Sequence, residues 1–97
     1  MSGTRRPTEP ISILVDQAGL VLLQKHAFPC SEDVLASATP TEYGIELTGT
    51  WVDMDMLVGF VAGEANYARK KNRTRQCRIL DEIADSLEAA LTPVGFF

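Results

Sequence analysis

Residues 50–70, T-W-V-D-M-D-M-L-V-G-F-V-A-G-E-A-N-Y-A-R-K, decide the fold of the C-terminal half of this chain. Thr50 and Asp53 have the spacing of a loose capping box, with Asp in place of Glu or Gln, and predict that a helix starts here. At 100° per residue, six apolar residues fall within one arc of about 100°. They are Met54, Leu57, Val58, Val61, Ala65 and Ala68. This stripe predicts a helix that continues to about Lys70.

A second apolar stripe lies on nearly the opposite side of the same helix. It consists of Met56, Phe60, Gly63 and Tyr67. A helix that is apolar on two sides is usually covered on both. We therefore expect one stripe to pack on the following helix and the other on the N-terminal elements.

The following helix is predicted over residues 74–91. Seven apolar residues share one face: Ile79, Leu80, Ile83, Ala84, Leu87, Ala90 and Leu91. Acidic residues occupy the other face, and Pro93 ends the helix. Because the join at 71–73 is short, the two helices should lie side by side and antiparallel.

The N-terminal half is expected to supply strands. Ile11–Val15 is apolar and β-branched, and residues 43–48 alternate apolar and polar side chains, which predicts a half-buried strand. Residues 17–28 fit either a helix capped by Asp16 or a strand over Leu20–His26, and helix propensity favours the helix. Ser31–Ala38 has the acidic start of a short helix.

These elements predict an α+β fold: a β-α-β-α-α domain over residues 11–97, ending in an antiparallel helical hairpin. The sheet would have two strands, or three if Leu20–His26 is extended. Residues 1–10 contain no large apolar side chain after Met1 and are expected to form a flexible tail.

Composition bounds the function. The 97 residues carry a net charge of −4, with 45% hydrophobic and 23% charged residues, as in an ordinary globular domain. Two distant cysteines and no apolar run long enough for a bilayer indicate a reduced, cytoplasmic protein without a membrane segment. His26 and Cys30 cannot complete a four-ligand metal site by themselves, so neither a metal nor a cofactor is expected.

The segment L-V-G-F-V-A-G-E-A-N at 57–66, followed by an acidic amphipathic helix, resembles a group of small bacterial proteins. Those proteins have a similar apolar-G-aromatic-apolar-A-x-E-A-N helix, with a histidine where this chain has Tyr67. The resemblance covers about 35 residues and implies a bacterial origin but no activity.

Two sets of polar residues are candidate sites. Six of the nine basic residues lie within ten positions: Arg69, Lys70, Lys71, Arg73, Arg75 and Arg78. Such a cluster suits phosphate, nucleic acid or an acidic protein surface. Glu64 falls between the two apolar stripes and is expected, with Asn66, to be a partly buried polar pair. A buried Glu64 would be a candidate general base.

A third candidate is an apolar patch at the far end of the hairpin. It would combine Trp51, Met54 and Met56 with Phe96 and Phe97. An exposed patch of this kind commonly marks an interface. The favoured interpretation is therefore a small interaction or regulatory module that forms a homodimer. The alternatives are a nucleic-acid or phosphate binder using the basic cluster, and an enzyme using Glu64.

Overall fold

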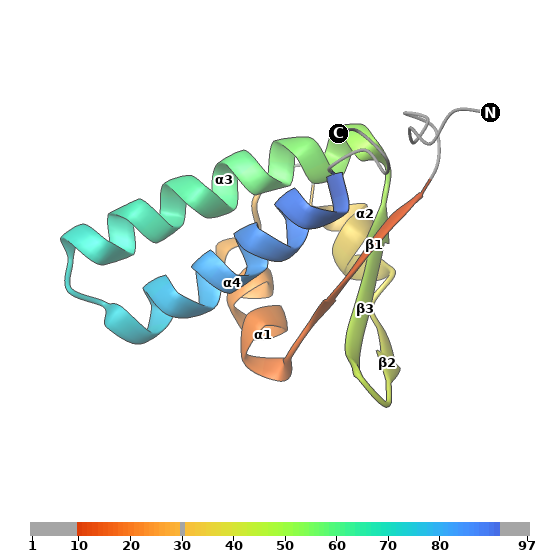
Figure 1. The fold of residues 1–97 in the computed structure, drawn as a ribbon, viewed down its shortest axis with the longest axis horizontal. Coiled ribbons are helices and arrows are strands. Elements are labelled where there is room, and N and C mark those ends of the chain that lie inside the picture. The colour runs from red at the N-terminus through yellow and green to blue at the C-terminus, as the bar shows by residue number, and fades with distance from the viewer. Residues whose placement is uncertain (1–9, 30, 92–97) are drawn as a thin grey trace.

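The computed structural model describes residues 10–29 and 31–91. Along the chain its elements are β1 (Ile11–Val15), α1 (Gln17–His26), α2 (Glu32–Ala36), β2 (Thr39–Thr41), β3 (Gly44–Gly49), α3 (Trp51–Lys70) and α4 (Thr74–Leu91) (Figure 1). The α+β class and the C-terminal helix pair are confirmed. The tail expected at 1–10 falls almost wholly outside the described residues, as do Cys30, Phe96 and Phe97.

In the described part of the chain, three strands form an antiparallel sheet in the order β1-β3-β2. Ile13 pairs with Leu47, and Thr39 pairs with Glu46. The inward side chains of β1 are buried, whereas the outward Ser12 and Leu14 are exposed. This alternation follows from the period-two geometry of a strand with one covered face.

The third strand is β2, and it does not lie at Leu20–His26. The latter residues belong to α1, because Asp16 Oδ1 accepts a hydrogen bond from the Gly19 N–H at 2.8 Å and caps the helix. Ala27 ends the helix in the left-handed conformation, with φ 48°. The prediction of a helix here is confirmed, and the strand alternative is wrong.

Strand β2 was not predicted. Its sequence, Thr-Pro-Thr, has no apolar alternation, and the strand forms only because β3 supplies hydrogen-bonding partners. Beyond β2, the Ser37 hydroxyl takes over this role and accepts the Thr48 N–H at 2.8 Å. On the side of β3 that faces β2, the backbone is therefore hydrogen-bonded partly by a side chain.

One contiguous core joins the sheet to the helices. Its fully buried large side chains include Ile11, Leu23, Leu47, Met54, Leu57, Val61, Leu80 and Leu87. Helices α3 and α4 run side by side along the long dimension of the molecule, and α4 also packs on β1 and α1 (Figure 1). The turn between α3 and α4 contains Asn72 in the left-handed conformation, with φ 58°.

Candidate interaction surface

Helix α3 has one buried face and one exposed apolar face. The buried face carries Met54, Leu57, Val61, Ala65 and Ala68, as the sequence predicted. On the other side, Val52 is 55% exposed, Met56 46%, Phe60 39% and Tyr67 48%. We call these four residues, with Gly59 and Gly63 between them, the outer face of α3.

This exposure corrects the expectation that α3 is covered on both sides. The single buried stripe packs into a core that already contains residues of α4, the sheet and the N-terminal helices. These elements therefore do not cover the second stripe. The ring of Phe60 stacks there with that of Phe28, with centroids 6.1 Å apart.

The two glycines make the outer face shallow at its middle. A Cβ placed on Gly59 or on Gly63 would meet no atom within 4 Å. Both residues are exposed. A helix or strand from another molecule could therefore approach the α3 backbone closely between Met56 and Tyr67.

The predicted patch at the hairpin end is not assembled as expected. Met54 is fully buried in the core, and Trp51 is half-buried against it. Met56 is exposed, but it belongs to the outer face of α3. Phe96 and Phe97 lie outside the described residues. The apolar surface that remains runs along the helix instead of capping its end.

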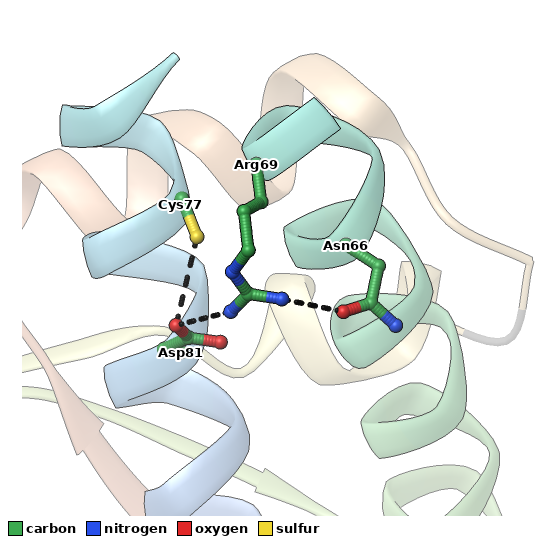
Figure 2. A network of polar contacts seen from close by, with 4 residues as sticks. All are labelled: Asn66, Arg69, Cys77 and Asp81. Carbon is green, nitrogen blue, oxygen red and sulfur yellow. Dashed lines mark hydrogen bonds and ion pairs between the residues drawn. The ribbon is translucent and has the colours of Figure 1, made fainter. Parts of the chain in front are cut away.

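The basic cluster lies around the turn between α3 and α4, and part of it is engaged by neighbours. Arg69 donates hydrogen bonds to Asn66 Oδ1 at 2.7 Å and to Asp81 Oδ2 at 3.1 Å (Figure 2). The thiol of Cys77 is 3.6 Å from the same Asp81 oxygen. Lys71 Nζ lies 5.7 Å from the centroid of the Tyr67 ring.

The remaining arginines of the cluster are more open. Arg73, Arg75 and Arg78 are exposed, and within the described residues no ion pair is formed by any of them. A groove of about 420 Å³ adjoins them, but Asp81, Glu82 and Asp85 line it together with Arg69 and Arg78. Its charge is therefore mixed, which weakens its attraction for anions.

Glu64 and Asn66 do not form a buried polar pair. Asn66 is exposed and binds Arg69, so the expectation of its burial is wrong. Glu64 is partly buried, and its Oε2 lies 4.0 Å from His26 Nδ1. No sequence signal pointed to this contact, because 38 positions separate the two residues and α1 lies near α3 only in the folded chain.

His26 is held by aromatic contact. Its ring stacks on Phe28 with centroids 5.2 Å apart, and its Nε2 is buried without a hydrogen-bond partner among the described atoms. Among residues 10–29 and 31–91, no three His, Cys, Asp or Glu side chains are grouped to hold a metal ion. The His26–Cys30 pair cannot be described, because Cys30 is outside those ranges.

No helix within the described ranges combines the length and apolar character that a membrane crossing requires. Comparisons of the chain with protein-family models, curated proteins and solved structures gave no match.

Proposed function

We propose that this protein is a small interaction module that self-associates as a dimer through the outer face of α3. One observation carries the proposal. Seven large hydrophobic side chains are exposed among the described residues, and four of them lie on this one helix face. The other three, Leu14, Val21 and Tyr43, are scattered over β1, α1 and the β2–β3 turn.

Clustering distinguishes an interface from an ordinary surface. Single exposed hydrophobic residues are normal on soluble proteins, whereas contiguous ones commonly mark binding sites. Val52, Met56 and Phe60 are spaced by four residues, and Tyr67 follows two turns later, so all four side chains project in similar directions. Recognition through such a helix face is a common way for proteins to bind one another.

The proposal includes the setting of the protein. The sparse, distant cysteines support a reduced cytoplasmic environment. The resemblance of residues 57–66 to small bacterial proteins supports a bacterial origin. In this setting a small dimeric module would act by binding a partner protein or by regulating one.

Light scattering at micromolar concentrations tests the proposal. The parent protein should show twice the monomer mass of 10.6 kDa. The variant Met56→Glu/Tyr67→Glu should show the monomer mass, because charged side chains cannot be buried against an apolar partner without a large cost. A parent mass that stays at 10.6 kDa up to millimolar concentration would refute self-association.

The control is Val21→Glu, which introduces one glutamate at a residue of similar exposure on α1. It should leave the dimer intact. If Val21→Glu dissociates the dimer as strongly as the α3 variant does, the interface does not lie specifically on α3.

A second candidate function is binding of nucleic acid or another polyanion at the hairpin turn. The exposed Arg73, Arg75 and Arg78 support it, since they have no described ion pair. An enzymatic role for Glu64 has less support. Four surface grooves described among these residues are lined by neither His26 nor Glu64, and a catalytic site usually lies in a cavity.

A further inference from the structure

Given the self-association proposed above, we infer that the two α3 helices cross antiparallel about a two-fold axis. Asp55 of each copy then lies beside Lys70 of the other. This inference adds the orientation and register of the pairing, which the exposed apolar face alone leaves open.

The charges of α3 have a direction. Asp53 and Asp55 lie near its start, Arg69 and Lys70 lie at its end, and Lys71 follows immediately. A parallel pair would place acid beside acid at one end and base beside base at the other. An antiparallel pair opposes each acidic end to a basic end, so one helix is complementary to a second copy of itself.

Asp55 and Lys70 also lie on the same flank of the outer face. At 100° per residue, Lys70 projects in line with Val52, which borders the outer face on the side away from Phe60. Asp55 lies about 60° beyond Val52 on that same side, and so about 100° from Met56. In a two-fold symmetric antiparallel pair, each flank faces the same flank of the other copy. The two charged residues can therefore meet across the edge of the apolar contact.

The glycines set a crossing point that fits the same symmetry. The midpoint between Gly59 and Gly63 is residue 61, and the midpoint between Asp55 and Lys70 falls between residues 62 and 63. Because a shift of a two-fold axis displaces one copy relative to the other by twice that shift, a crossing at residue 61 offsets Asp55 from Lys70 of the other copy by three residues, or about 4.5 Å at 1.5 Å per residue. The lysine side chain is long enough to absorb that difference.

The same axis brings apolar side chains together. A two-fold axis that passes through residues 61–62 places Tyr67 of one copy opposite residues 55–57 of the other, which include Met56. A methionine sulfur against an aromatic ring is a favourable contact. The open backbone at Gly59 and Gly63 allows the helices to approach where they cross, because the side chains at the contact set the distance between axes.

Acids at the start of a helix and bases at its end also interact favourably with the helix dipole within one copy. The test must therefore separate pairing between copies from stability within one copy. Charge exchange in the full-length protein does so when dimer dissociation and thermal unfolding are both measured.

Sedimentation equilibrium at low salt should show that Asp55→Lys and Lys70→Asp each weaken the dimer about tenfold, since two exposed ion pairs per dimer become repulsive. The double variant Asp55→Lys/Lys70→Asp should recover the parent affinity. The differences should shrink in about 1 M salt, where charges are screened within a few ångströms. Glu42→Lys, an exposed change in the β2–β3 turn, is the control and should have no effect.

Failure of the inference differs from failure of the proposed function. If the parent dimerises but the single variants bind equally well, or the double variant does not recover, antiparallel pairing is wrong and the interaction module stands. If the parent is monomeric at all concentrations, both are wrong. If the double variant recovers its dimer while its melting temperature stays below that of the parent, the recovery arises between copies, as inferred.

Discussion

Gly49, the last residue of β3, lies against Val34 of α2 so closely that an added Cβ would be 2.7 Å from Val34 Cγ2. Real Cβ atoms do not approach a carbon that closely, so α2 can pack on the end of the sheet only because residue 49 has no side chain. Val34 is fully buried at this contact.

Gly49→Ala should therefore destabilise the fold by about 1–3 kcal/mol, the usual cost of overpacking a core. Chemical denaturation monitored by circular dichroism measures this change. The double variant Gly49→Ala/Val34→Ala should lose less stability than the sum of the losses in the two single variants, because the smaller side chain at residue 34 makes room for the added methyl group.

Gly59→Ala is the matched control, because nothing lies within 4 Å of the added methyl group. In a helix interior this change should stabilise the monomer by about 0.5–1 kcal/mol. Equal effects of Gly49→Ala and Gly59→Ala would show that the contact with Val34 is not what disfavours a side chain at 49.

Truncation of core side chains in the helical hairpin should reduce stability more strongly. Leu87 is fully buried and Ile83 nearly so. Leu87→Ala or Ile83→Ala should cost about 2–5 kcal/mol, because the cavity adds to the lost transfer free energy. Glu82→Gln on the exposed side of α4 should change stability by no more than about 0.5 kcal/mol. Melting temperatures within a degree of the parent for the alanine variants would contradict the observed packing.

The Arg69–Asp81 pair joins α3 to α4 at the surface, with side chains 58% and 47% exposed. A double-mutant cycle with Arg69→Ala and Asp81→Ala should give a coupling of about 0.2–1 kcal/mol, because solvent screens exposed pairs. The coupling should fall as salt is raised. A coupling of several kcal/mol, unaffected by salt, would mean that the pair is far better shielded than its exposure indicates.

The basic turn has its own test. If it binds polyanions, Arg73→Ser/Arg75→Ser/Arg78→Ser should abolish a salt-sensitive interaction with heparin or an oligonucleotide while the melting temperature stays within a few degrees. Fluorescence anisotropy at low salt measures the binding. Equal binding by parent and variant, or none by either, would leave these arginines as solvated surface residues.

Local sequence determined the two C-terminal helices and the two longer strands, and it left residues 17–28 open between a helix and a strand. The bounds of α3 and α4 followed from apolar periodicity, from the cap at Thr50, whose hydroxyl accepts the Asp53 N–H at 3.1 Å, and from the short turn between them. The buried stripes followed too, because a 3.6-residue period places such side chains on one face whatever they contact.

Only the tertiary structure decided whether the second apolar face of α3 was covered. The outer face of α3 looked like a core stripe because hydrophobic spacing does not reveal how many neighbours a helix has. Strand β2 has no pattern of its own and exists through its hydrogen bonds to β3. The contact of His26 with Glu64 and the ion pair of Arg69 with Asp81 each join residues on different helices. These contacts are therefore created by the packing of the helices and not by local propensity.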